Sequence, residues 1–210
     1  MEMAPIRQRL AGNNDLSFLV TGVGMVEATL SLGQQLSRLG GDVRGVVNFG
    51  VAGAYVETGV EILDICLAKR EIIGDLGVSD GEQVVPFDDE AVMAPVDFSL
   101  QNPLQVRADA ILNEKNVAHH TGVFVTVNSV SGSRSRGIFL RDRYLAICEN
   151  MEGAAIARTC VAHGIDCLEL RSVSNMVEDR DPSRWQLAEA IDVCAEAAAQ
   201  LIPSLLDTGS

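Results

Sequence analysis

Short apolar runs along the chain alternate with longer stretches that have helical spacing. The apolar runs lie at residues 16–21, 43–49, 117–127 and 167–173, and each is bounded by glycine or polar residues, which predicts strands. Helical spacing follows over residues 25–39, 103–115, 133–143, 151–163 and 182–206. Strands that alternate with helices favour a largely parallel sheet covered on both faces. The pattern therefore predicts one α/β domain over residues 1–210, a three-layer αβα sandwich with a mixed, largely parallel central sheet.

Three segments have a less regular pattern. Residues 62–73 read as extended, although Asp64 and Cys66 interrupt the apolar run, and residues 145–148 read as a short strand. Residues 74–101 are rich in Gly, Asp and Pro and predict a long excursion over the surface. Its apolar part, residues 84–98, is longer than an idle surface loop, so we expect it to contact a second copy in a homodimer.

Composition narrows the classes of partner. The apolar fraction of 47% is enough for a sizeable core, and the formal net charge of −13 disfavours binding to nucleic acid and to anionic membranes. No apolar run approaches the roughly 20 residues that cross a bilayer. The five cysteines form no Cys-x-x-Cys pair and the three histidines lack metal-ligand spacing, so we expect no metal, no cofactor and a cytoplasmic protein with reduced thiols.

Two polar side chains stand where a ligand would bind. Glu152 lies at the predicted start of a helix, and Asn175 follows the predicted strand 167–173. Ligands of open α/β sheets bind at such strand ends. A carboxylate can accept protons from two ribose hydroxyls, and an amide can both donate to and accept from neighbouring purine atoms. The pair predicts a nucleoside pocket. The alternatives are a Glu that only favours the helix dipole and an Asn that only shapes a turn.

Four sequence blocks resemble the nucleoside phosphorylase and nucleosidase superfamily, and within it the futalosine hydrolases of menaquinone biosynthesis. The blocks are Gly22-Val23-Gly24-Met25, Asn48 to Ala54, Asn150-Met151-Glu152, and Arg171 to Asn175. The resemblance implies an N-glycosyl hydrolase that releases hypoxanthine from futalosine, binds no cofactor and forms a homodimer. Members of the family begin with an apolar strand that is not recognisable here, and Glu2 falls at the position of the family's catalytic base.

The resemblance also implies a set of site residues. Glu2 activates the attacking water as general base, Glu152 holds the ribose, and Asn175 stabilises the leaving base. The remaining substrate-binding positions are Val51, Ala52, Gly53, Val130, Asn150, Met151, Ser174 and Trp185. Trp185 would close the far end of the pocket, where Arg134, Arg136 or Arg180 could bind the carboxylate of the substrate.

Three positions that differ among members of the family decide the expected substrate and reaction. Adenine-specific relatives carry Asp where this chain has Asn175, and an amide matches the O6 acceptor and N7–H donor of hypoxanthine. Phosphorylases use an Arg and a Ser for phosphate where this chain has Asn48 and Val51, so water is the expected nucleophile. A nucleosidase or phosphorylase for another purine nucleoside (inosine, methylthioadenosine or aminofutalosine) and a non-catalytic nucleoside-binding relative stay open as alternatives.

Overall fold

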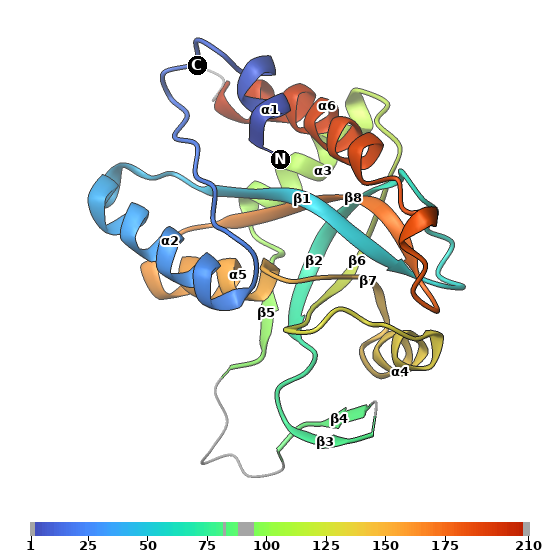
Figure 1. The fold of residues 1–210 in the computed structure, drawn as a ribbon. Helices are drawn as coiled ribbons and strands as arrows, with labels where there is room; N and C mark the ends of the chain where they lie inside the picture. Colours follow the sequence, from blue (N-terminus) through green and yellow to red (C-terminus); the bar gives the residue numbers. More distant parts are fainter. Residues whose placement is uncertain (1–2, 82, 88–94, 208–210) are drawn as a thin grey trace.

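A computed structural model describes residues 3–81, 83–87 and 95–207, which form a six-stranded sheet between helices (Figure 1). The order across the sheet is β5-β2-β6-β7-β1-β8. The strands are β1 (Val46–Tyr55), β2 (Ile65–Ile73), β5 (Asp97–Ser99), β6 (His119–Thr126), β7 (Ala146–Asn150) and β8 (Cys167–Val177). The expected α/β class is confirmed.

The sheet is mixed and strongly curled. The pairs β1–β8, β2–β6 and β6–β7 are parallel, whereas β1–β7, β2–β5 and β2–β8 are antiparallel. Because β2 pairs with β6 on one side and with β8 on the other, the strands β2, β6, β7, β1 and β8 close into a ring. This closure brings the buried faces of β2 and β8 together, and polar groups on these two strands meet in the interior.

Helices cover both faces of the sheet, as the three-layer prediction requires (Figure 1). One layer contains α1 (Met3–Arg9), α3 (Pro103–Glu114) and α6 (Leu187–Leu206), whose buried apolar side chains form one core with Leu168 and Leu170 of β8. The other layer contains α2 (Met25–Leu39) and α5 (Gly153–His163). A further helix, α4 (Arg134–Tyr144), packs over Tyr55 and Val125 in a separate, smaller core.

Local sequence explains where several helices begin and end. The side chain of Asn102 accepts a hydrogen bond from the backbone N–H of Gln105, and Pro103 occupies the first turn of α3. Ser133 caps α4 in the same way through the N–H of Arg136. Gly164 ends α5 with φ of 67°, a left-handed conformation that glycine adopts without strain.

The surface excursion contains a small hairpin outside the main sheet, formed by β3 (Val78–Asp80) and β4 (Gln83–Val85). Short 3₁₀ turns lie at η1 (Gly40–Asp42) and η2 (Pro182–Arg184). The expected dimer contact at residues 84–98 falls partly outside the described residues. None of the described helices is long and apolar enough to cross a membrane.

The predicted strand at residues 16–21 is wrong. This segment carries no strand pairing in the structure, although Leu16, Phe18 and Leu19 pack on the hydrophobic cores. An apolar run fixes burial, but a strand also needs a neighbour that completes its hydrogen-bond ladder. Within the described residues, no strand lies in register beside this segment.

Element boundaries near the site also differ from the prediction. β1 continues through Gly50 to Tyr55, and β8 continues through Asn175 to Val177, so both strands are longer than their apolar runs. The helix α5 begins at Gly153, two residues later than predicted. The predicted helix 182–206 is split, because η2 ends before Trp185 and α6 begins at Leu187. Asn175 therefore lies inside a strand and Trp185 lies in a connection.

Candidate active site

Glu152 occupies the N-cap position of α5, and neighbouring groups hold both of its carboxylate oxygens. Its Oε1 accepts a hydrogen bond from the backbone N–H of Gly24 at 3.0 Å, and its Oε2 lies 3.6 Å from Nη2 of Arg171. Gly24 has φ of 89°, a backbone conformation that favours glycine, so the 22–25 block presents its N–H to the carboxylate. With 16% of its side chain exposed, Glu152 remains open to a ligand.

Arg171 supplies the positive charge next to Glu152. Its side chain is 4% exposed, its Nε donates to Oε1 of Glu169 at 2.8 Å, and its Nη1 donates to the carbonyl of Val51 at 3.3 Å. One guanidinium thus contacts β8, the end of β1 and the carboxylate before α5. A planar guanidinium has several fixed donors, which suits it to such a junction.

The start of α5 is held by two buried polar side chains. Oδ1 of Asn150 accepts from the backbone N–H groups of Glu152 at 2.9 Å and Gly153 at 2.7 Å, and Oγ1 of Thr126 accepts from Ala154 at 2.7 Å. These bonds satisfy N–H groups that lack a partner within the helix. Asn150 is 5% exposed and also donates to Glu71, so its polar atoms face the core.

Asn175 lies at an irregularity of β8. Ala52 pairs with Val173 and Gly53 pairs with Asn175, which leaves Ser174 as the extra residue of a β-bulge. The Ser174 hydroxyl lies within hydrogen-bond distance of the Ala52 carbonyl at 3.3 Å and of Oδ1 of Asn175 at 2.9 Å. Bulges are frequent beside active sites because they re-aim side chains. Here the bulge aims Asn175 into a pocket.

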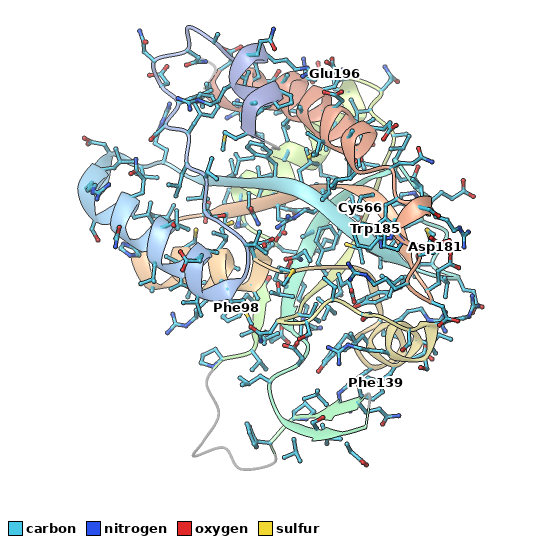
Figure 2. All side chains as sticks on the ribbon, viewed as in Figure 1. Cys66, Phe98, Phe139, Asp181, Trp185 and Glu196 are labelled. Carbon is cyan, nitrogen blue, oxygen red and sulfur yellow. The ribbon has the colours of Figure 1, made fainter. Side chains whose placement is uncertain are left out.

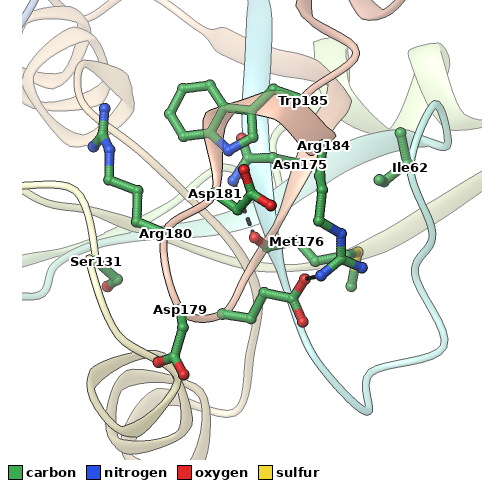
Figure 3. Close-up of a pocket in the computed structure, with 10 residues that line it drawn as sticks. Ile62, Ser131, Asn175, Met176, Asp179, Arg180, Asp181, Arg184 and Trp185 are labelled. Atoms are coloured by element: carbon green, nitrogen blue, oxygen red, sulfur yellow. Dashed lines mark hydrogen bonds and ion pairs between the residues drawn. The ribbon is translucent and has the colours of Figure 1, made fainter.

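The pocket beside Asn175 is closed by the segment that follows β8 (Figure 3). Its lining residues are Ile62, Ser131, Asn175, Met176, Glu178, Asp179, Arg180, Asp181, Arg184 and Trp185. The guanidinium of Arg180 lies 4.9 Å from the centre of the Trp185 ring, a cation–π contact. Figure 2 shows Trp185 and Asp181 on the same side of the molecule, at the η2 turn. The structure thus brings Trp185 and Asn175, predicted separately, to one pocket.

A buried carboxyl group, that of Glu149, holds Ser131, one of the residues that line this pocket. Glu149 is 4% exposed and accepts hydrogen bonds from the backbone N–H of Ser131 at 2.8 Å, the Ser131 hydroxyl at 2.6 Å and the Tyr55 hydroxyl at 3.2 Å. Burial raises the pKa of Glu149, and the hydrogen bonds from Ser131 and Tyr55 oppose that rise. Glu149 fixes the loop that carries Ser131 and Val130 against β7.

The other predicted residues lie in different surroundings. Val51, Ala52 and Gly53 lie in the second half of β1 and run beside β8, between the positions of Arg171 and Asn175. These two β8 residues are four positions apart, roughly 13 Å at about 3.3 Å per residue. Val130 is 40% exposed, Met151 is half-buried beside Glu152, and the predicted base Glu2 lies outside the described residues.

The three candidate arginines have different surroundings. Arg134 pairs with Glu57 at 2.9 Å, and Arg136 lies 3.5 Å from Asp75. Arg180 stacks on Trp185 and lines the pocket. Of the three, Arg180 is therefore in the best position to meet a ligand in this pocket. Among the described residues, no group of three or more His, Cys, Asp or Glu side chains is arranged to hold a metal ion.

Sequence reasoning did not single out Arg171 or Glu149. A signal for Arg171 was present, because Glu169 and Arg171 interrupt the apolar strand two residues apart and side chains at that spacing share one strand face. Opposite charges on a buried face predict an ion pair. Glu149 carries no comparable signal, since its partners Ser131 and Tyr55 come from distant segments.

Gly53 offers a direct test of the Asn175 assignment. A Cβ added there would lie 3.2 Å from Nδ2 of Asn175 and 3.0 Å from Cγ2 of Val177, so Gly53→Ala should displace the amide. We expect the affinity for hypoxanthine, the base that the family resemblance implies, to fall by about tenfold in calorimetric titration. The control is Gly33→Ala inside α2, where an added Cβ meets nothing within 4 Å. Unchanged affinity in the Gly53 variant would remove Asn175 from the base site.

Comparison with known proteins gives one family. A model described as the Phosphorylase superfamily matches residues 5–207. The futalosine hydrolase of Thermus thermophilus is 31% identical over 192 residues, which cover 88% of this chain and 80% of that protein. The futalosine hydrolase of Streptomyces coelicolor is also 31% identical, covering 89% and 78%, and an aminodeoxyfutalosine nucleosidase of Helicobacter pylori is 26% identical, covering 93% and 81%.

Solved structures agree on the fold. A structure titled as a futalosine hydrolase mutant of Helicobacter pylori strain 26695 has a TM-score of 0.82 at 22% identity, covering 97% of this chain and 94% of that one. The relatives are named as hydrolases and nucleosidases, which confirms the prediction of an N-glycosyl hydrolase. The family match over most of the chain, with relatives above 30% identity, shows that the chain belongs to the phosphorylase superfamily.

Proposed function

We propose that this nucleosidase hydrolyses futalosine to hypoxanthine and dehypoxanthine futalosine, a step of menaquinone biosynthesis. The observation that carries the proposal is the placement of Glu152 and Asn175 along the β1–β8 strand pair. Glu152 lies beside Arg171 of β8, and Asn175, farther along β8, lines a pocket with Trp185. The names of the two 31% identical relatives support futalosine as the substrate.

Water is the proposed nucleophile. The family resemblance assigns the phosphate ligands of phosphorylases to positions that Asn48 and Val51 occupy in this chain, and both lie on β1. Neither an amide nor an isopropyl group supplies the positive charge that phosphate binding favours. The general base is proposed to be Glu2, by resemblance alone. A homodimer and a cytoplasmic location also remain predictions.

Glu152 has the charge that cleavage of an N-glycosidic bond requires. Breaking the bond to the base leaves positive charge on the ribose, as in other oxocarbenium-like reactions. A carboxylate fixed by Gly24 and Arg171 can accept the ribose hydroxyls and favour this charge without reorganising. The leaving purine becomes electron-rich at the same time, and Asn175 can hydrogen-bond with it at N7 and O6.

The first prediction concerns the reaction. Incubation with futalosine in phosphate-free buffer is expected to release hypoxanthine, and liquid chromatography of the products measures it. Inosine and methylthioadenosine are the comparison substrates, since the relatives include nucleosidases with other specificities. Release that depends on added phosphate would contradict hydrolysis, and faster cleavage of either comparison substrate would contradict futalosine.

The second prediction concerns the base. In Asn175→Asp, a carboxylate replaces the amide and faces the O6 acceptor of hypoxanthine. The contact is repulsive, because both oxygens are acceptors and no proton lies between them. The same carboxylate suits the 6-amino group of adenine. We expect the ratio of kcat/KM for aminofutalosine over futalosine to rise by at least about tenfold, since about 1.4 kcal/mol of differential binding is one decade.

One result would contradict the base-reading role of Asn175, and a control variant accompanies it. A ratio that stays flat while both activities fall means that Asn175 supports the pocket without reading the 6-position of the purine. Ser174→Ala is the matched control, because it removes the neighbouring hydroxyl that contacts Oδ1 of Asn175 and leaves the amide in place. The control is expected to keep the wild-type preference between the two substrates.

A further inference from the structure

Two carboxyl groups face each other in the core below the start of α5. Glu71 of β2 is 0% exposed and Glu169 of β8 is 1% exposed. A Cβ built on Gly153 would lie 2.0 Å from Oε1 of Glu71 and 2.4 Å from Oε2 of Glu169, so both side chains occupy the space that this glycine leaves. Two adjacent carboxylates in a dry interior cannot both be ionised, because their repulsion is not screened by water. The pair therefore shares one proton.

The surroundings assign that proton to Glu71. Glu169 accepts a charge-assisted hydrogen bond from Nε of Arg171 at 2.8 Å, so a cation already faces this side chain. The partners of Glu71 are neutral: Asn150 donates to Oε1 at 2.6 Å and Thr126 donates to Oε2 at 2.8 Å. Burial, followed by the nearby Glu169, raises the pKa of Glu71 well above its ordinary value. Glu71 is thus a neutral acid that donates to Glu169.

The neutral acid and the carboxylate contact different parts of the ribose site. Asn150, which donates to Glu71, accepts from the backbone N–H groups of Glu152 and Gly153. Arg171, which Glu169 holds at 2.8 Å, lies 3.6 Å from Glu152. The shorter contact makes Glu169 the principal counter-ion of Arg171. Without that carboxylate, the guanidinium would be drawn onto Glu152 and would offset its charge.

We propose that Glu71 and Glu169 are positioning residues for the ribose carboxylate: Glu169 holds Arg171 so that Glu152 keeps its negative charge for the substrate, and Glu71 fixes Asn150 and through it the backbone at Glu152. The inference rests on the proposed role of Glu152. It assigns a functional reason to two buried acids and to Gly153, whose missing side chain makes room for them.

The remaining titratable groups near the pair are thiols. Cys66 of β2, Cys148 of β7, Cys160 of α5 and Cys167 of β8 are buried. Burial is the largest cause that raises the pKa of Cys148. For Cys167, the largest cause that raises the pKa is the hydrogen bond between Cys167 and Cys160. Both thiols are therefore neutral near pH 7, and the charges that face the pair are those of Arg171 and Glu152.

A matched pair of substitutions tests the proposal. Glu71→Gln and Glu169→Gln each replace one buried acid by a neutral group of the same size. We expect Glu71→Gln to lower kcat less than Glu169→Gln does, because Gln keeps an acceptor for Asn150 and resembles the protonated acid. Glu169→Gln is expected to lower kcat about 10- to 100-fold, part of the loss that follows removal of a transition-state charge. Glu169→Asp, which keeps the charge, is expected to fall between them.

The order of the variants decides the outcome. Equal losses in Glu71→Gln and Glu169→Gln, or a larger loss in Glu71→Gln, would overturn the proposal and indicate a purely structural pair. If Glu169→Gln does not fold, the kcat of Glu71→Gln can still be compared with that of Glu169→Asp. A lower kcat in Glu71→Gln than in Glu169→Asp would then overturn the proposal. The assay uses whichever nucleoside the wild-type protein cleaves, so a different substrate would contradict the proposed function and leave this test intact.

Thermal melting tests the proton assignment without any substrate. A carboxyl whose pKa is raised on folding contributes stability that is complete below its unfolded pKa, about 4.3, and is lost as pH rises through the folded pKa. Glu71→Gln lacks this loss. Its Tm relative to wild type should rise between pH 5 and pH 8, by at least about 2 °C. A difference that is constant or falls with pH would show that Glu71 is ionised in the folded protein, which overturns the proposal.

Discussion

The ion pair between Arg171 and Glu169 is the interaction on which the surroundings of Glu152, the proposed ribose carboxylate, depend. A guanidinium with 4% exposure is stable only when charges and acceptors surround it, because an unpaired buried charge costs several kcal/mol. Glu169, Glu152 and the carbonyl of Val51 supply those partners. They come from β8, from the N-cap of α5 and from β1. One buried cation thereby fixes the relative positions of three elements whose ends form the site.

Ring closure of the sheet explains why this charge network lies in the interior. β2 pairs with β8 through residues 65–67 and 170–172, which brings Glu71 and Glu169 to the same interior space. The network ends at Glu152, the proposed ribose carboxylate. The proposed base side is built differently, since the bulge at Ser174 aims Asn175 at the pocket and Gly53 leaves room for its amide. Under the proposed function, the reaction centre would lie between a charged end and a neutral, hydrogen-bonding end.

The sequence predicted the layers and most of the helices, and it supplied Glu152 and Asn175 as the central residues of the candidate site. Those features follow from local pattern: apolar periodicity, the caps at Asn102 and Ser133, and the blocks around Glu152 and Asn175. The errors arose where pairing between distant segments decides the structure. Residues 16–21 have strand-like composition without a ladder partner, and Gly50–Gly53 extend β1 because β8 runs beside them. The Asn150 side chain turned out to face the core, since Glu71 meets it from β2.

The most direct test of the ribose site is the turnover of Glu152→Gln with futalosine. Gln keeps the size and loses the charge, so kcat is expected to fall about 10²- to 10³-fold with little change in Tm. The matched control is Glu189→Gln, because Glu189 is an exposed acid in the first turn of α6 and tests the helix-dipole contribution alone. The control is expected to keep wild-type turnover. Near wild-type kcat in folded Glu152→Gln would contradict a catalytic ribose carboxylate at this position.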